Sequence, residues 1–302
     1  MTKLELFGLV LPEIKKGDDL ASLIVHEAER QCGGVQENDI IIVTSKIISK
    51  AKGYIIPMPK KFSRDAIFLS KITKKPLWEC ELILKLSRRI VAAIPTTEII
   101  LRFNLHKILS KNPERAKKVL MEDPVILVVE NARGSLCSDA ELDLSNVPKG
   151  FVYLPPPDPD LEARELREKI ENITSKHVAV IVTDTEVSPF KIGSVDIAVG
   201  SSGIVPISRK FASPDMYGHL KYGGVDVIVD ELASAAALLM GQTAEGIPVV
   251  IVRGLTFEKA EKMCIKNILL SRKILHYGIV RTLVSTFWFK LHMLVYKIFR
   301  LK

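Results

Sequence analysis

Short apolar runs alternate with stretches of helical periodicity over most of this chain, and the alternation predicts an α/β fold of mixed sheets with flanking helices. Strands are predicted at residues 4–11, 39–44, 125–129, 177–183, 194–199, 225–229 and 248–252. Uninterrupted β-branched runs of this kind are typical of strands buried on both faces. Helices are predicted at Asp19–Arg30, with Asp18 or Asp19 as N-cap, at Leu161–Lys176 and at Val229–Met240.

Residues 60–123 have a different composition, rich in Leu, Ile and Lys, and predict a helical insertion punctuated by Pro95 and Pro113. The Pro-rich stretch 148–160 predicts a stiff, extended connector. Helix is expected again from Phe257 towards the end. We therefore expect one domain over 1–256 that contains the insertion, followed by a helical, aromatic and basic extension over 257–302.

The stretch 277–302 is aromatic and aliphatic but carries Arg281, Lys290 and His292. A transmembrane helix needs about 20 mostly uncharged apolar residues, so no membrane span is predicted. Two interpretations remain for an apolar helix with basic interruptions. It packs on its own domain or a partner subunit, which a broad apolar face favours, or it lies at a membrane surface.

Composition excludes some function classes and leaves others. The 302 residues carry a net charge of +8, which suits anionic partners, but no nucleic-acid-binding pattern accompanies it. The four cysteines, Cys32, Cys80, Cys137 and Cys264, are widely separated, so neither a zinc site nor a disulfide framework is indicated. The first residues form no signal-peptide core, and a cytoplasmic location is expected.

Two acidic segments carry the densest chemistry, Ala140–Asn146 and Val182–Thr185. Each follows or ends an apolar run, and a carboxylate at the end of a buried strand needs a cation or several donors. Two such groups suggest a divalent metal with oxygen ligands and, with it, phosphate chemistry. Taken singly, Asp143 and Asp184 are more simply interpreted as turn caps.

The order of the motifs adds to this picture. They are Leu11-Pro12-Glu13-Ile14, Thr44-Ser45-Lys46 through Ser49-Lys50-Ala51-Lys52-Gly53, Leu142-Asp143-Leu144-Ser145-Asn146, Leu154-Pro155-Pro156-Pro157-Asp158-Pro159-Asp160, Val182-Thr183-Asp184-Thr185, Asp196-Ile197-Ala198-Val199-Gly200, Asp215-Met216-Tyr217-Gly218 and Leu239-Met240-Gly241-Gln242 continuing to Gly254. This ordered set resembles the coenzyme F420-0:γ-glutamyl ligase family over about residues 4–60 and 124–256.

The resemblance implies a two-subdomain α/β fold, a homodimer, and an enzyme that uses GTP and Mg²⁺ or Mn²⁺, with K⁺ as a further candidate ion. Such an enzyme joins L-glutamate to coenzyme F420-0 through an acyl phosphate. By position, the metal ligands are Asp143, Asp184, Thr185 and Gln242. The nucleotide-binding positions are Leu11, Pro12, Glu13, Ile14, Ser45, Lys46, Lys50, Asn146, Met240, Gly241, Gln242, Thr243, Ala244, Glu245, Gly246, Ile247 and Pro248.

Each of these positions also has a simpler interpretation: helix capping for Asn146, a solvated face for Lys46 and Lys50, and a turn for Gly241. The chain departs from the family pattern close to the chemistry. Glu141 replaces a Gly, Ser188 stands at an expected Arg, and Gly224 stands where Thr is common. Lys191 occupies another basic position and is a candidate anion contact.

Two hypotheses follow from these departures. The chain is a ligase with a remodelled pocket for F420-0 or a related carboxylate acceptor, or it is a catalytically impaired paralogue that keeps the fold as a nucleotide-binding, regulatory or interaction module. In either case the aromatic extension is a candidate surface for a partner or a membrane.

Overall fold

A computed structural model describes residues 3–188 and 191–300, and in addition the side chains of Arg272 and residues 297–300 are not described. The chain consists of two compact units, Met1–Ile268 and Leu269–Lys302. The first contains all the sheets, and the second is formed by helix α10 (Arg272–Arg300). The predicted extension runs on to Leu301 and Lys302, which lie outside the described residues, as do Pro189 and Phe190.

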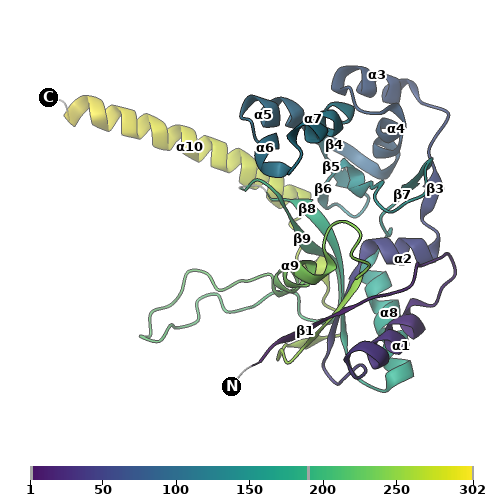
Figure 1. The fold of residues 1–302 in the computed structure, drawn as a ribbon. Helices are drawn as coiled ribbons and strands as arrows, with labels where there is room; N and C mark the ends of the chain where they lie inside the picture. Colours follow the sequence, from purple (N-terminus) through teal and green to yellow (C-terminus); the bar gives the residue numbers. More distant parts are fainter. Residues whose placement is uncertain (1–2, 189–190, 301–302) are drawn as a thin grey trace. The chain divides into compact units, whose positions relative to one another are not determined.

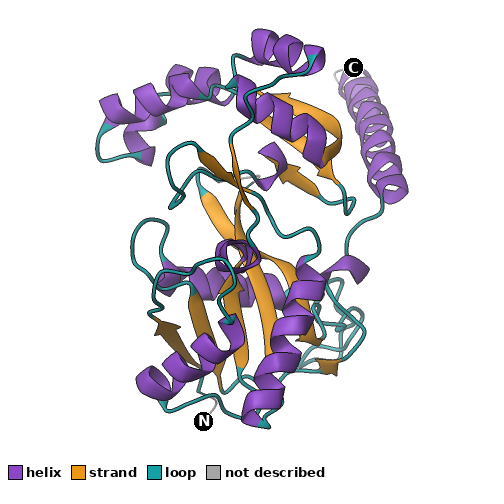
Figure 2. Cartoon of the chain, turned by 90° about the vertical axis from the view of Figure 1, so that its right-hand side faces the viewer, coloured by secondary structure: helices purple, strands orange, loops and turns teal. Residues whose placement is uncertain are grey.

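A six-stranded mixed sheet forms the centre of the first unit (Figures 1 and 2). Its strands, in spatial order, are β1 (Glu5–Leu9), β10 (Val249–Arg253), β2 (Ile40–Thr44), β8 (Ala179–Val187), β9 (Ser194–Ile204) and β11 (Lys259–Ala260). Strands β2 and β8 are parallel neighbours, and every other pair is antiparallel. The α/β class with mixed sheets is confirmed.

Helices cover both faces of this sheet because its central strands are apolar on both sides. Along β2, Ile41 and Val43 belong to the core formed with α1 (Leu20–Cys32) and α8 (Pro159–Thr174). Ile40 and Ile42 point the other way and are equally inaccessible to solvent. Helix α9 (Ile228–Met240) packs against the sheet through a buried face that combines Ala233 and Ala236 with larger apolar residues. The apolar runs in β2, β8 and β10 are therefore strands buried on both faces, as predicted, whereas in the run 125–129 only the face with Leu127 and Val129 is buried.

Twelve further elements of the first unit lie between β2 and β8 in sequence. They are α2 (Ser45–Lys52), β3 (Ile55–Pro57), α3 (Arg64–Thr73), α4 (Leu77–Leu86), β4 (Ser87–Ile94), α5 (Thr96–Arg102), α6 (His106–Leu109), α7 (Pro113–Glu122), β5 (Ile126–Asn131), β6 (Leu136–Ser138), the 3₁₀ turn η1 (Asp139–Glu141) and β7 (Phe151–Tyr153). Strands β3 and β7 pair, and β4, β5 and β6 form a second small sheet. A separate core lies between this sheet and helices α3 and α4.

The structure corrects the prediction of an all-helical segment at 60–123. Residues Ser87–Ile94 form strand β4, which pairs with β5 along its length. The local composition favours a helix here. The edge of β5, however, offers backbone hydrogen-bond partners that a strand can use and a helix cannot, so tertiary pairing overrides the intrinsic helix propensity. The segment is therefore an integral part of the second sheet.

Three further expectations differ from the structure. Residues 225–229 do not form a strand, because α9 begins at Ile228 with Val227 as its N-cap. After Phe257 the chain forms β11 and the 3₁₀ turn η2 (Ile265–Asn267), and helix begins only at Arg272. The Pro-rich connector contains β7 and gives way to α8 at Pro159.

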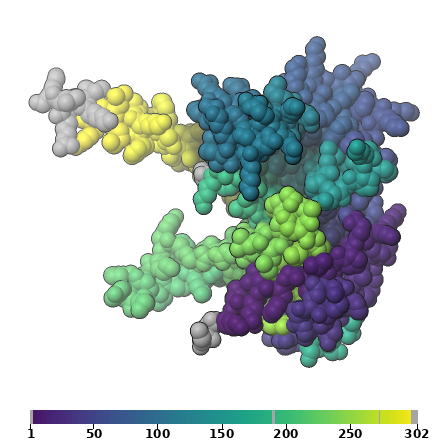
Figure 3. All heavy atoms as spheres, in the orientation of Figure 1, coloured from purple at the N-terminus to yellow at the C-terminus, as the bar shows by residue number. Residues whose placement is uncertain are grey.

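Residues 207–226 form an extended arm that projects from the first unit, pale green in Figures 1 and 3. Its two sides meet at an isolated bridge between Pro214 and Leu220 and at an edge-to-face contact of Phe211 with Tyr222, whose ring centroids are 5.5 Å apart. Met216 and Tyr222 are each 97% exposed, so the arm presents bare apolar surface.

Candidate functional site

The parallel pairing of β2 with β8 places Ser45 beside Asp184. Thr44 is the register partner of Thr183, so the next residue of each strand lies at the same edge of the sheet. The Ser45 hydroxyl donates to Oδ2 of Asp184 at 2.7 Å, and the buried Tyr153 hydroxyl donates to Oγ of Ser45 at 2.9 Å. Asp184 is thus held by a chain of hydroxyl groups at the sheet edge.

Asp184 is an unusually basic carboxylate. Burial, helped by the nearby carboxylates of Glu141 and Asp143, raises its pKa from 3.8 to about 7, and the hydrogen bond from Ser45 offsets only part of this effect. A carboxylate whose charge is opposed by burial and by other acids is stabilised by any cation that reaches it. The site therefore has the electrostatic character of a cation-binding site.

Asp143 lies on the other side of Tyr153, with which it forms an isolated backbone bridge. Its Oδ2 is 2.5 Å from Nζ of Lys46, and its Oδ1 accepts from the backbone N–H of Ser145 at 2.6 Å. Burial opposes its charge, but the bonds from Lys46 and Ser145 outweigh burial and lower the pKa of Asp143. The Lys46 ammonium also lies 5.8 Å from the centroid of the Tyr153 ring.

The sequence-predicted ligands Thr185 and Gln242 meet at a third acid, Asp196. The Thr185 hydroxyl donates to Oδ1 of Asp196 at 2.7 Å, and the Gln242 amide donates to the same oxygen at 3.1 Å. Thr185 and Asp196 are register partners in the β8–β9 pair. Asp196 begins one of the sequence motifs but was not predicted as a site residue. The sequence signal that could have identified it is a carboxylate two residues into a β-branched run.

The predicted nucleotide-binding segments also come together. Leu11 donates its backbone N–H to the carbonyl of Gly246 at 3.4 Å, and Thr44 donates to that of Pro248 at 3.0 Å. The Asn146 amide donates to the carbonyl of Thr243 at 3.0 Å. These bonds join the 240–248 loop to the segments that begin at Leu11 and Ser45, which lie far apart in the sequence.

The geometry contradicts the simpler interpretations of Asn146, Lys46 and Lys50 and supports that of Gly241. Asn146 caps no helix, because its amide reaches across to the 240–248 loop. Lys46 and Lys50 are not a solvated face: their side chains are only 23% and 10% exposed, and Lys50 pairs with Glu13 at 2.6 Å. Gly241 does end α9, with φ +65°, and a Cβ there would collide with Glu245.

The prediction that Asp143 and Asp184 lie at the ends of apolar strands is only partly right. Asp184 lies inside β8, just beyond a register shift at Thr183, and Asp143 follows β6 and η1 rather than β5. The Asx-turn interpretation holds for Asp143, because its carboxylate accepts from the N–H two residues on. It fails for Asp184, whose carboxylate binds Ser45 across the sheet. Asp143 can therefore cap a turn and belong to the candidate site at the same time.

Glu141, at a position where Gly was expected, has a left-handed backbone with φ +59°, as do Asp139 and Ala140 before it. Three consecutive non-glycine residues in this region store strain. The Glu141 carboxylate accepts from the Asn131 amide at 3.2 Å and lies 3.4 Å from Arg133. Arg133 thus partly balances the charge that Glu141 adds beside Asp184.

The other departures have different surroundings. Ser188 donates its backbone N–H to the carbonyl of Gly193 at 3.0 Å, and Lys191 is exposed. Gly224 has φ +77°, and a Cβ there would lie 3.0 Å from the carbonyl oxygen of Lys210, so a Thr would be strained at this position. The glycine is consistent with the local backbone.

A second acidic cluster lies in the small core. In the described part of the chain, Glu79, Asp123 and Asp139 are the one group of three potential ligand residues whose donor atoms lie within 4.8 Å of one another. The fully buried ammonium of Lys75 lies between them, 2.8, 2.6 and 3.2 Å from the three carboxylates. The cluster already holds its cation and is a buried ion network.

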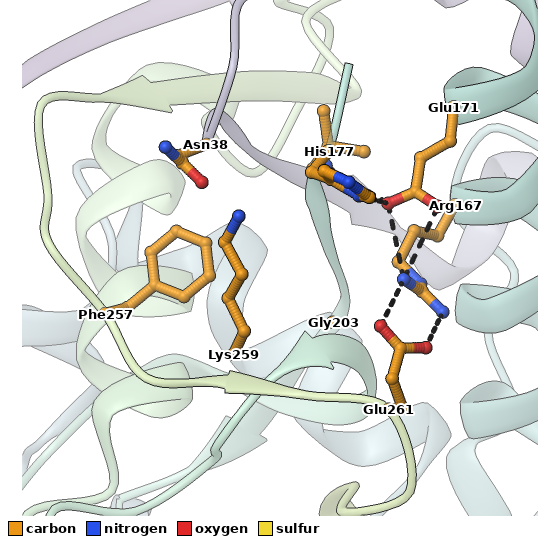
Figure 4. A pocket seen from close by; sticks show the side chains of 9 residues that line it. Asn38, Arg167, Glu171, His177, Gly203, Phe257, Lys259 and Glu261 are labelled. Carbon is orange, nitrogen blue, oxygen red and sulfur yellow. Dashed lines mark hydrogen bonds and ion pairs between the residues drawn. The ribbon is translucent and has the colours of Figure 1, made fainter. Parts of the chain in front are cut away.

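A pocket opens at the opposite edge of the main sheet from Asp184 (Figure 4). Asn38 and His177 line it, and they precede the starts of β2 and β8, whereas Ser45 and Asp184 lie towards the ends of those strands. Its Arg167 is already paired with Glu261 at 2.7 Å and with Glu171 at 3.3 Å. Lys259, which also lines the pocket, lies 3.6 Å from Glu37, so both of these cations already have acidic partners.

Comparison with known proteins identifies the family of this chain. Residues 8–254 match the family model described as F420-0:Gamma-glutamyl ligase, a span that holds every candidate site residue. The chain belongs to this family. Relatives named coenzyme F420:L-glutamate ligase include those of Methanosarcina mazei, 36% identical over 248 residues, and Methanopyrus kandleri, 34% identical over 243 residues. The matches cover 82% and 80% of this chain and 84% and 83% of the relatives.

A third relative of the same name, from Methanocaldococcus jannaschii, is 32% identical over 255 residues, covering 83% of this chain and 88% of its own length. The family is one of enzymes that form C–N bonds, and the chain is accordingly a ligase of this family. Helix α10 lies beyond the matched residues 8–254.

Proposed function

We propose that this ligase joins L-glutamate to coenzyme F420-0 in a reaction that consumes GTP and depends on Mg²⁺ or Mn²⁺. Membership of the family supports the acceptor and the amino acid. One observation carries the metal dependence: the half-buried Asp184 carboxylate, with a pKa raised to about 7, lies close enough to Glu141 and Asp143 to be repelled by both. Such a group requires a cation when it is ionised.

The residues at the sheet edge fit a hard divalent cation in their chemistry. Asp143, Asp184, Thr185 and Gln242 are all oxygen donors, which Mg²⁺ and Mn²⁺ prefer. Bound there, the cation would neutralise charge on a transferring phosphoryl group. Asp196 would orient Thr185 and Gln242 through the hydrogen bonds that both donate to it. K⁺ would be an auxiliary ion.

The nucleotide would lie along the seam between α2 and the 240–248 loop. Lys50 is paired with the exposed Glu13, whose side chain is 74% accessible, so a phosphate can replace Glu13 as its partner. Lys46 can turn from Asp143 to phosphate in the same way. Both lysines act as point charges rather than bidentate clamps. Asn146 fixes the position of the 240–248 loop through Thr243.

The proposed reaction has two steps. An acceptor carboxylate oxygen attacks the γ-phosphorus of GTP, the bond to the bridging oxygen breaks, and GDP leaves. The glutamate amine then attacks the carbonyl carbon of the acyl phosphate, phosphate leaves, and the amine proton passes to phosphate or water. Lys46 and Lys50 would offset the charge of the departing phosphates.

We further propose a cytoplasmic homodimer. Support for a dimer comes from the 207–226 arm, whose Met216, Tyr217 and Tyr222 are almost wholly exposed. An apolar arm of this kind is stabilised when a second copy covers it.

The test is incubation with GTP, MnCl₂, L-glutamate and F420-0, with measurement of GDP release and product mass. We expect one GDP for each glutamate joined, and loss of both signals with EDTA. An Asp196→Asn variant should keep its fold but lose at least tenfold in metal-dependent activity. GDP release without glutamylated product would identify a different acceptor. No GDP release and no metal-dependent GTP binding would instead favour the impaired-paralogue hypothesis.

A further inference from the structure

Helix α10 has a chemical character unlike that of the first unit. It extends over 29 residues, which corresponds to about 43 Å at 1.5 Å per residue. It contains no Asp or Glu, and its basic residues are Arg272, Lys273, Arg281, Lys290, Lys297 and Arg300. A helix with many cations and no acid is complementary to an anionic surface.

The apolar residues of α10 follow a helical repeat. Tyr277, Val280, Val284, Phe287 and Leu291 are spaced three and four residues apart, so they form one continuous stripe. Trp288, next to this stripe, forms an edge-to-face contact with Phe287 at a centroid distance of 5.9 Å. Together these side chains make an apolar face with aromatic rings, which are the side chains enriched at lipid–water interfaces.

The opposite side of the helix changes character along its length. Gly278, Thr282 and Ser285 make it polar in the first half, but Phe289 and Met293 make it apolar in the second, where they are 64% and 41% exposed. One flat protein surface cannot cover both sides of a straight helix. A lipid interface can, because the helix sinks into it and the long Lys290 side chain reaches back to the headgroups.

Crossing the membrane is excluded for this helix. None of the described helices is long and apolar enough to span a bilayer, and Lys290 interrupts the most apolar part of α10. The remaining arrangement lies parallel to the membrane, with the stripe below the headgroups.

We propose that α10 binds the ligase to an anionic lipid surface, lying in the interface through the stripe that contains Phe287. This surface is separate from the sheet-edge site and does not depend on the proposed reaction. Its partner is a bilayer of acidic phospholipid, which both the excess of basic residues and the aromatic stripe fit.

The experiment uses the full chain and sucrose-loaded vesicles, either pure phosphatidylcholine or phosphatidylcholine with 30% phosphatidylserine, followed by co-sedimentation. Two variants add the same negative charge on opposite sides of the helix: Phe287→Glu on the stripe and Ser285→Glu away from it. The added charge alone should weaken binding by about fivefold in both. Phe287→Glu also loses the apolar contact and should bind at least tenfold more weakly than Ser285→Glu.

Several results would overturn the proposal. Equal losses of binding in the two variants would contradict the assignment of the Phe287 stripe as the side that enters the lipid. Equal binding to both vesicle types would show that the charge of the lipid does not contribute. Failure of the wild-type chain to sediment with anionic vesicles would contradict it outright. Dissociation of an oligomer by Phe287→Glu, without vesicle binding by the wild type, would assign the stripe to a second copy. Unchanged thermal unfolding of both variants confirms that the first unit is intact.

Discussion

Replacing Asp184 by Asn should stabilise the ligand-free protein at alkaline pH while abolishing its response to divalent metal. The folded-state pKa of Asp184 is about 7 and its ordinary value is 3.8. The folded protein therefore binds this proton more tightly than the unfolded chain does. As the pH rises from 3.8 to about 7, the folded state loses stability relative to the unfolded chain, and above 7 the loss is complete.

The size of the effect follows from the same values. A pKa rise from 3.8 to about 7 corresponds to about 4 kcal/mol, at roughly 1.4 kcal/mol per pH unit. The NH₂ group of the new side chain cannot accept from Ser45 in place of Oδ2, which costs about 1 kcal/mol. The variant should thus be more stable than the wild type by about 3 kcal/mol at pH 8, and by less than about 1 kcal/mol at pH 5.

Urea unfolding in EDTA at pH 5 and pH 8 measures both differences, and a parallel series with MnCl₂ measures the response to metal. Mn²⁺ should raise the unfolding midpoint of the wild type and leave that of Asp184→Asn unchanged. A variant no more stable than the wild type at pH 8, or a difference that does not change with pH, would refute the reasoning about Asp184.

Asp143 provides a control of opposite sign. Its pKa is lowered by Lys46 and Ser145 in spite of burial, so its contribution to stability is present above about pH 4 and is lost as the pH falls through its folded-state pKa. Asp143→Asn should therefore destabilise the ligand-free protein at pH 8. If both variants shifted stability in the same direction, general loss of negative charge would explain the result better than the individual environments.

Three further predictions concern stability, each measured as the free energy of unfolding in urea. Gly200→Ala should cost about 2 kcal/mol, because the new Cβ would lie 2.3 Å from the backbone of Pro159; an unchanged midpoint would contradict this contact. Arg253→Ala should cost about 3–5 kcal/mol by leaving the buried Asp39 unpaired, and Asp39→Asn in the same chain should restore part of it. Lys75→Met should cost a similar amount, about 3–5 kcal/mol, and a loss below about 1 kcal/mol would show that its acidic partners take up protons instead.

The fold could be predicted where the local pattern and the tertiary structure agree. The runs at Ile40–Thr44 and Val249–Arg253 are strands because they are apolar on both faces, and α9 ends where Gly241 takes a positive φ. Strand β4 was missed because its partner, β5, lies beyond helices α5, α6 and α7 along the chain, and no local pattern reports a pairing of that range.

In the candidate site, too, some residues could be predicted from the sequence and others depend on long-range strand pairing. Ordered motifs were sufficient to select Ser45, Asp143 and Asp184, and the parallel register of β2 with β8 then explains why the first and last of these meet. The role of Asp196 depends on the antiparallel β8–β9 register, which the sequence does not specify. The pairing of Lys46 with Asp143 likewise depends on the small β3–β7 sheet, because Tyr153 of β7 forms the backbone bridge to Asp143 and lies beside Lys46.

Lys46 balances the charge of Asp143 before any ligand arrives. In the ligand-free protein its ammonium occupies the place beside Asp143 that a divalent cation would take, and this keeps the carboxylate ionised and ready. Under the proposed function the cation and a phosphate would arrive together, so Asp143 would exchange Lys46 for the metal while Lys46 would exchange Asp143 for phosphate. Neither of these partly buried charges would be left unpaired, whereas binding of either ligand alone would leave one of them without its partner. Binding of metal and nucleotide should therefore be strongly cooperative, and Lys46→Met should reduce that cooperativity more than it reduces the affinity for metal alone.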